Sequence, residues 1–187
     1  MITVRQERPT DIEPREALLD FSFGQGRFDK TSERLREGRL PAEDLSFVAV
    51  EHGRIVGTVR LWHVSTGSGQ PALLLGPLAV APDRRRRGVG TALVRRALRD
   101  ARRRGHRALM LVGDAPYYGR FGFTAAKTRT LELPGPYEPA RFLALELVPG
   151  GLDGARGLIR ATGPLFSKPD TGANARLCPS NMMPLAA

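Results

Sequence analysis

The residues most able to do chemistry in this chain form a run of four arginines and two glycines, from Arg84 to Thr91. The run follows an apolar segment and opens a stretch with helical periodicity. The first backbone N–H groups of a helix lack carbonyl partners and carry a partial positive charge. Glycines at 88 and 90 let the backbone turn tightly and approach a ligand closely. The segment therefore predicts an anion site, and the simpler alternative is a glycine-eased loop whose arginines are solvated.

Two familiar phosphate loops do not fit these residues. A Walker loop requires a lysine after its last glycine, but Thr91 follows Gly90. A dinucleotide-binding fingerprint requires a third glycine at position 93, which is leucine. The pattern therefore excludes both nucleotide-binding folds.

Alternating and helical hydrophobic patterns predict the elements that hold this loop. Strands are expected at residues 2–6, 46–51, 55–64, 72–80, 108–112, 128–133 and 141–148, and helices towards residue 21 and at 31–37, 88–104 and 116–120. The strand, helix and strand within 72–112 predict a right-handed parallel crossover in a mostly antiparallel sheet. Gly76-Pro77 interrupts the apolar strand at 72–80 and predicts a bulge or local splay, because proline cannot donate to a sheet ladder.

The net charge of +10 is concentrated in one part of the chain. Eleven arginines and one acid, Asp100, lie between Arg84 and Arg107, so basic and acidic residues balance elsewhere. This cluster raises a nucleic-acid-binding module as an alternative function. Few aromatic residues are interleaved with the arginines and no nucleic-acid motif is present, which argues against that alternative.

Cysteine content and hydropathy indicate the class of protein. Cys178 is the one cysteine, so no intrachain disulfide is expected, and no Cys/His cluster suggests a metal site. No apolar stretch follows Met1, and the longest nearly apolar run, residues 71–82, is shorter than the roughly 20 residues of a membrane-spanning helix. We expect a cytoplasmic protein with one compact domain, no metal and no membrane insertion.

Two ordered motifs resemble those of the GNAT superfamily of N-acetyltransferases. The first is Leu78-Ala79-Val80-x-Pro82-x-x-Arg85-x-x-Gly88-x-Gly90-Thr91, and the second is Tyr118-Gly119-Arg120-Phe121-Gly122-Phe123. The resemblance implies a mixed α/β fold with a central, mostly antiparallel, twisted sheet of about seven strands. It also implies a splayed parallel pair and about four flanking helices. A GNAT domain would span residues 1–148, and residues 149–187 would be an extension that packs on the domain or on a partner subunit, or is partly flexible.

The same resemblance implies acetyl-CoA as the co-substrate and identifies residues that would bind it. Backbone groups of Leu78 and Val80 would hold the pantetheine arm and the acyl carbonyl. Arg85 occupies the first position of the motif. The pyrophosphate would rest on the backbone amides of Arg86, Arg87, Gly88, Val89, Gly90 and Thr91. Tyr118 matches the tyrosine that protonates the departing thiolate, and Tyr117 is its competitor.

The resemblance implies direct transfer of an acetyl or other short acyl group to a small-molecule or protein amine. The amine must be neutral when it attacks, so a base or a water relay is required. The strand at 72–80 has no ionisable side chain, which leaves His63, Asp114 and Glu51 as candidate bases by location. A ping-pong mechanism through Cys178 is disfavoured because no histidine lies near it in the sequence. Aminoacyl-tRNA is a further candidate acceptor, a homodimer is compatible, and an idle acyl-CoA sensor is the alternative.

Overall fold

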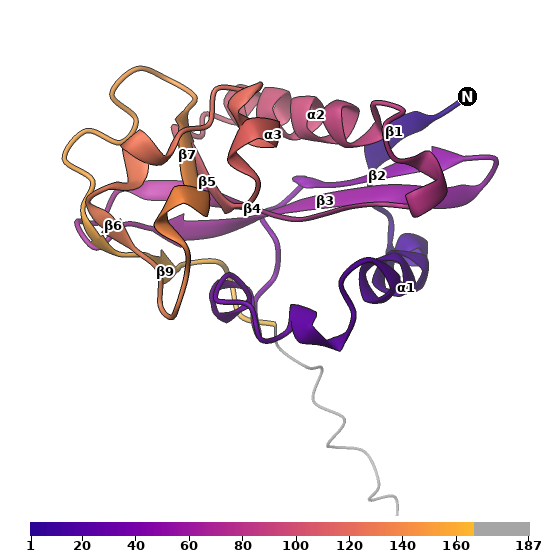
Figure 1. The fold of residues 1–187 in the computed structure, drawn as a ribbon, viewed down its shortest axis with the longest axis horizontal. Helices are drawn as coiled ribbons and strands as arrows, with labels where there is room; N and C mark the ends of the chain where they lie inside the picture. Colours follow the sequence, from indigo (N-terminus) through magenta and orange to yellow (C-terminus); the bar gives the residue numbers. More distant parts are fainter. Residues whose placement is uncertain (167–187) are drawn as a thin grey trace, which may run out of the picture.

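The structure, a computed structural model, describes residues 1–166. Its centre is a seven-stranded sheet in which β1, β2, β3, β4, β5 and β7 lie side by side in that order, while β9 pairs with β3 (Figure 1). These strands are β1 (Thr3–Gln6), β2 (Ser46–Glu51), β3 (Arg54–Ser65), β4 (Pro71–Val80), β5 (Ala108–Val112), β7 (Phe142–Glu146) and β9 (Arg160–Ala161). All neighbours are antiparallel except β4 and β5. The predicted fold class, with about seven strands and one parallel pair, is confirmed.

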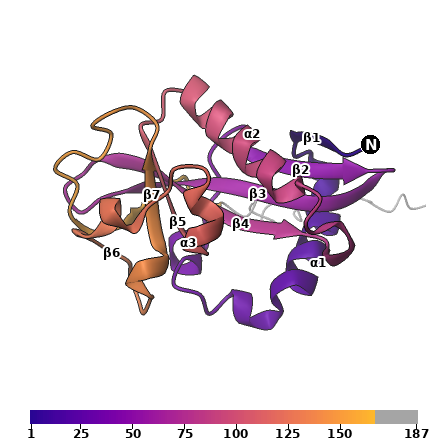
Figure 2. The same ribbon diagram turned by 45° about the horizontal axis from the view of Figure 1, so that its top comes forward.

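Helices cover both faces of this sheet. The α1 helix (Ile12–Phe23) lies on one face, and α2 (Val89–Arg103) and α3 (Ala115–Gly119) lie on the other (Figures 1 and 2). The apolar side of α2 is buried, and it includes Leu93, Val94 and Ala97. This burial follows from the 3.6-residue period of its apolar positions. Short 3-10 helices span Pro9–Asp11, Gln25–Arg27, Glu33–Leu35, Pro82–Arg84, Ala125–Thr128 and Pro139–Arg141.

Two predicted elements differ from those observed. The helix expected at 31–37 is only a 3-10 helix over Glu33–Leu35, because so short a segment cannot sustain an α-helix without a long apolar face. The strand expected at 128–133 is limited to β6 (Leu131–Glu132), which pairs with β8 (Gly157–Leu158) outside the main sheet. Thr128 instead ends a 3-10 helix, and its hydroxyl donates to the Phe142 carbonyl at 2.7 Å.

The parallel pair is splayed, as Gly76-Pro77 predicts. β4 pairs with β5 only through Leu73↔Leu109 and Leu74↔Met110, so the rest of β4 leaves that edge without a strand partner among residues 1–166. The Gly76–Pro77 peptide bond is cis. The Trp62 indole N–H donates to the Gly76 carbonyl at 2.7 Å and so fixes the irregular segment to β3. The free backbone edge of β4 beyond this point is available to a ligand.

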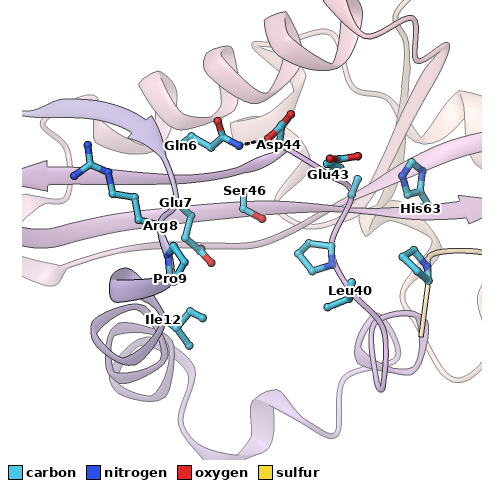
Figure 3. Close-up of a pocket in the computed structure, with 13 residues that line it drawn as sticks. Gln6, Glu7, Arg8, Pro9, Ile12, Leu40, Glu43, Asp44, Ser46 and His63 are labelled. Carbon is cyan, nitrogen blue, oxygen red and sulfur yellow. Dashed lines mark hydrogen bonds between the residues drawn. The ribbon is translucent and has the colours of Figure 1, made fainter. Parts of the chain in front are cut away.

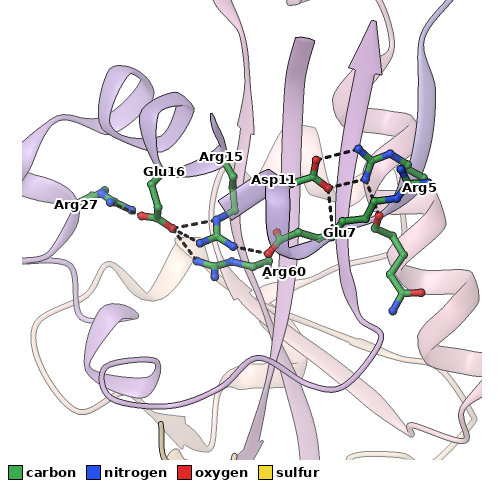
Figure 4. Close-up of polar contacts among 9 residues, drawn as sticks. Arg5, Glu7, Asp11, Arg15, Glu16, Arg27 and Arg60 are labelled. Carbon is green, nitrogen blue, oxygen red and sulfur yellow. Dashed lines mark hydrogen bonds and ion pairs between the residues drawn. The ribbon is translucent and has the colours of Figure 1, made fainter. Parts of the chain in front are cut away.

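A network of ion pairs fixes α1 to the sheet (Figure 4). Glu16 on α1 accepts from Arg15 and Arg27, each at 2.6 Å, and lies 3.7 Å from Arg60 of β3. Arg15 also pairs with Glu7. Burial, followed by repulsion from Arg15, lowers the pKa of Arg60 to about 10. The carboxylates of this network therefore offset positive charge that is costly to bury.

The segment after residue 148 lies along the domain as far as the structure describes it. β9 pairs with β3 through Val64↔Ala161 and Ser65↔Arg160. Near its end, the Leu40 N–H donates to the Pro164 carbonyl at 2.8 Å. Cys178 lies outside the described residues. No helix within residues 1–166 has the length and apolar character needed to cross a membrane.

Candidate active site

The loop between β4 and α2 presents the backbone as a concave cradle. Arg86 has φ 61° and Gly88 has φ 79°, so two left-handed residues turn the chain into the helix. The first bond of the helix runs from the Ala92 N–H to the Gly88 carbonyl at 2.9 Å. The N–H groups of the preceding first turn have no acceptor within the helix and are free to bind an anion.

A cavity of about 550 Å³ adjoins this cradle. The predicted cofactor-binding residues that line it are Leu78, Val80, Arg85, Arg86, Gly88, Val89, Gly90 and Thr91. Arg87 is not among its lining residues. Arg84, Tyr117 and Arg120 complete the wall, and the Arg120 guanidinium lies 4.5 Å from the centre of the Tyr117 ring. The structure thus brings together the splayed end of β4, the arginine loop and the start of α2.

Position 90 of the cradle requires glycine, because a side chain there would collide with Tyr117. A Cβ atom at this position would lie 2.6 Å from the Tyr117 hydroxyl and 3.6 Å from the Val80 side chain. Any side chain at position 90 would therefore displace Tyr117 and narrow the cavity. Burial raises the pKa of Tyr117, so its hydroxyl remains neutral and able to donate at physiological pH.

The arginines of the loop are not equivalent. Arg84 forms ion pairs with Glu51 and, at 3.0 Å, with Asp83, so its charge is already compensated. The hydrogen bond from Arg84 holds the pKa of Glu51 below its usual value, which makes Glu51 a poor base. Arg85 bends back towards the end of β4, with its Nε 3.4 Å from the Val80 carbonyl. Positive charge at the cradle therefore comes chiefly from Arg85, Arg86 and Arg120.

A second cavity, of about 230 Å³, lies on the α1 side of the splay. Its walls come from the end of α1, from the segment between α1 and β2, from β4 and from the end of β5. Leu78 lines both this cavity and the cradle cavity. The two cavities therefore border the same residue of β4, where this strand parts from β5.

Tyr118 faces the second cavity and not the cradle. Its ring lies against Gly113, where a Cβ atom would be 2.4 Å from a ring carbon, and 9% of the residue is exposed. Burial raises the pKa of Tyr118 well above its usual value, and the charge of Asp114 adds to this effect. The phenol is therefore a neutral proton donor beside the splay, while its neighbour Tyr117 belongs to the cradle.

The predicted bases are separated by the fold. His63 lies opposite Leu73 in the β3–β4 ladder, its ring 5.6 Å from that of His106, and it lines a third cavity of about 600 Å³ (Figure 3). Glu43 and Asp44 line the same cavity (Figure 3), which shares no lining residue with the cradle cavity. Asp114 does line the second cavity, but it also caps α3 by accepting from the Tyr117 N–H at 3.0 Å.

Sequence reasoning missed the basic side chains of the second cavity. Lys30 and Arg36 lie in the segment between α1 and β2, whereas Arg141 lies far along the chain, just before β7, and the three form no motif. Their only signal in the sequence is their charge, which the arginine cluster at 84–107 obscures. Within residues 1–166, no group of three or more His, Cys, Asp or Glu side chains could hold a metal ion.

Comparisons with known proteins agree with this geometry. Residues 12–123 match the Acetyltransferase (GNAT) family. An uncharacterized N-acetyltransferase of Escherichia coli (strain K12), YhbS, is 30% identical over 158 residues, which cover 83% of this chain and 93% of YhbS. The crystal structure of Escherichia coli YhbS in complex with CoA superimposes with a TM-score of 0.74, covering 86% of this chain and 89% of that one. A GNAT family acetyltransferase from Brucella melitensis in complex with acetyl-CoA has a TM-score of 0.66 at 27% identity, covering 87% and 96% of the two chains. The chain belongs to the GNAT family of acetyltransferases.

Proposed function

We propose that the protein transfers an acetyl group from acetyl-CoA directly to the amine of a second substrate. The observation that carries this proposal is that two cavities share Leu78 as a lining residue, where β4 parts from β5. One cavity has the backbone cradle for a pyrophosphate, and the other leaves room for an acceptor. The CoA and acetyl-CoA complexes of the two relatives support the choice of ligand for the cradle.

Three parts of the chain would bind acetyl-CoA. The free N–H groups at the start of α2 would hold the pyrophosphate, with the helix dipole favouring its negative charge. Arg85 and Arg86 would add charge at the rim. The unpaired edge of β4 from Leu78 to Val80 would bind the pantetheine amides as an added strand would. The acetyl group would then lie at the splay, beside Tyr118.

The transfer step exchanges one bond for another at the acetyl carbonyl carbon. The nitrogen of the neutral amine forms a C–N bond to this carbon, and the C–S bond to CoA breaks. Tyr118 donates its phenolic proton to the departing sulfur. The nitrogen loses one proton as the amide forms, and water returns this proton to Tyr118, so the products are an acetylated amine and CoA.

Calorimetric titration with acetyl-CoA tests the cradle. We expect the wild-type protein to bind acetyl-CoA with a Kd of about 1 mM or lower, as is typical of enzyme substrates. Gly90→Val should weaken binding at least about tenfold, equivalent to about 1.4 kcal/mol, because its side chain enters the cradle.

Gly26→Val is the matched control, since a Cβ atom at Gly26 meets nothing within 4 Å and the residue lies away from the cradle. Circular dichroism checks that both variants fold. The absence of acetyl-CoA binding by the wild-type protein would refute the proposed function. Equal weakening by both variants would show that the cradle does not hold the ligand.

A further inference from the structure

The second cavity is basic, although no basic motif predicts it. Its lining includes four basic side chains, Arg27, Lys30, Arg36 and Arg141, against two acidic ones. The acidic residues are Glu33 and Asp114. A cationic acceptor would therefore meet net positive charge as it approached the splay.

Two of the four cations are partly compensated by carboxylates. Arg27 turns towards α1, where it pairs with Glu16 at 2.6 Å and with Asp20 at 2.9 Å. Arg36 pairs with Glu33 at 2.6 Å through Nη2. The Arg36 side chain is 7% exposed, and its buried Nε finds no hydrogen-bond partner within residues 1–166.

Arg36 also points towards the splay. A Cβ atom at Gly76 would lie 3.6 Å from its Nη1, so the guanidinium faces the irregular segment of β4. This geometry puts a nearly buried charge close to where the acceptor must sit. An anion there would gain a charge-assisted hydrogen bond, which is stronger than a neutral one.

Lys30 and Arg141 are the uncompensated cations. Neither has a carboxylate within 4 Å among the residues that the structure describes. The Lys30 ammonium lies 4.4 Å from the centre of the Phe23 ring, and the Arg141 Nε lies 3.4 Å from the Gly113 carbonyl. Burial lowers the pKa of Lys30, and repulsion from Arg36 and Arg141 lowers it further, as expected when three cations face one space.

We infer that the second cavity binds an anionic group, a carboxylate or a phosphate monoester, carried by the acceptor amine. The anion would lie among Lys30, Arg36 and Arg141, with the amine directed towards Leu78 and Tyr118. A volume of about 230 Å³ favours a small acceptor of amino-acid size. This inference rests on the proposed function, because it assumes that the acceptor enters here.

The same positive charges would help the acceptor amine to lose its proton without a protein side chain acting as base. A positive environment disfavours the ammonium form of the acceptor and so lowers its pKa. More of the amine is then neutral and able to attack. The cavity would thus select an anionic acceptor and also promote loss of the amine proton to water.

Matched acceptor pairs test the inference by release of free CoA thiol. One arm compares L-amino acids with their carboxamides, a second compares O-phosphoethanolamine with ethanolamine, and spermidine represents polycations. We expect kcat/KM for the anionic member of at least one pair to exceed that of its neutral partner by about tenfold or more, as charge-assisted hydrogen bonds of about 1.5–3 kcal/mol would allow. Equal or better use of the amides or of spermidine would overturn the inference.

Variants identify the residues responsible. Lys30→Gln and Arg141→Gln should each raise KM for the anionic acceptor about tenfold, and should raise KM for its neutral partner much less. Lys127→Gln is the control, because this lysine pairs with Glu146 away from the cavity. An unchanged KM in both cavity variants would reject the assigned site.

Equilibrium binding measurements distinguish a failure of this inference from a failure of the proposed function. Calorimetry of the CoA-loaded protein with the same acceptor pairs should show tighter binding of the anionic member, whether or not turnover occurs. Acetyl-CoA binding without any preference for anionic acceptors would overturn this inference alone. Loss of acetyl-CoA binding itself would overturn the proposed function.

Discussion

The carboxylate of Glu16 joins three arginines that would otherwise repel one another beneath the sheet. Replacing it in Glu16→Gln keeps the size of the side chain and removes its charge. Arg15, Arg27 and Arg60 would then share only the remaining carboxylates around them. Because Arg27 also lines the second cavity, the substitution tests both the stability of α1 and the setting of that cavity.

The expected loss follows from how deeply these groups are buried. The side chain of Arg15 is 7% exposed, and those of Arg27 and Arg60 are each 14% exposed, whereas Glu16 is 35% exposed. Removing one partner of a buried pair costs about 3–5 kcal/mol. Exposed pairs contribute about 0–1 kcal/mol. Glu16 lies between these limits, so we expect a loss of about 2 kcal/mol, or a Tm lower by about 4–8 °C for a chain of this size.

Urea unfolding followed by circular dichroism at several pH values measures this loss. Burial opposes ionisation of Glu16, but hydrogen bonds from Arg27 and Arg15 outweigh it and hold the pKa of Glu16 below its ordinary value of 4.5. A carboxyl whose folded pKa is lowered stabilises the protein above its unfolded pKa and loses that contribution as the pH falls through the folded value. The difference between wild type and variant should therefore be constant above about pH 5 and shrink below pH 4.5.

The control is Glu37→Gln, since Glu37 is exposed and lies outside the network. We expect this change to alter stability by less than about 0.5 kcal/mol. A loss in Glu16→Gln no greater than in Glu37→Gln would refute the reasoning. A difference that persists unchanged at pH 3 would show that packing, and not charge, is responsible.

The remaining predictions concern the splay and its tyrosines. Trp62→Phe removes the donor to the buried Gly76 carbonyl and should cost about 1–3 kcal/mol in urea unfolding, together with a lower kcat for thiol release. Unchanged values would mean that this bond does not position the splay. Tyr118→Phe should lower kcat about 10²-fold without changing the calorimetric Kd for acetyl-CoA. Tyr117→Phe should mainly affect that Kd, and the opposite result would identify Tyr117 as the acid. Because the pKa of Tyr118 is raised, its loss of a proton should not reduce wild-type kcat at any pH below about 10.

The parts of the fold that could be predicted are those whose signal is local. The apolar period of α2 and the β-branched runs of β2 and β3 predict these elements to within about one residue. The cradle is also local, since Gly88 and Gly90 belong to the turn that they form. Gly76-Pro77 predicts the splay for the same reason, because the interruption lies within the strand itself.

The second cavity could not be predicted in this way. Lys30, Arg36 and Arg141 meet only because the segment after α1 folds across the end of β5, and no pattern in the sequence encodes that contact. The different surroundings of Tyr117 and Tyr118 are equally hidden. In a helix of one turn, a change of one residue decides whether a side chain faces the cradle or the splay.

The splay also bears on the order in which substrates bind. The cradle cavity is lined by the start of α2 and the second cavity by the end of α1, and these two helices lie on opposite faces of the sheet (Figure 1). Neither ligand would have to pass through the site of the other, so each could bind to and leave the free protein. Initial-velocity measurements with both substrates varied should give intersecting double-reciprocal lines. CoA and the acetylated product should then dissociate in either order, without one trapping the other inside the enzyme.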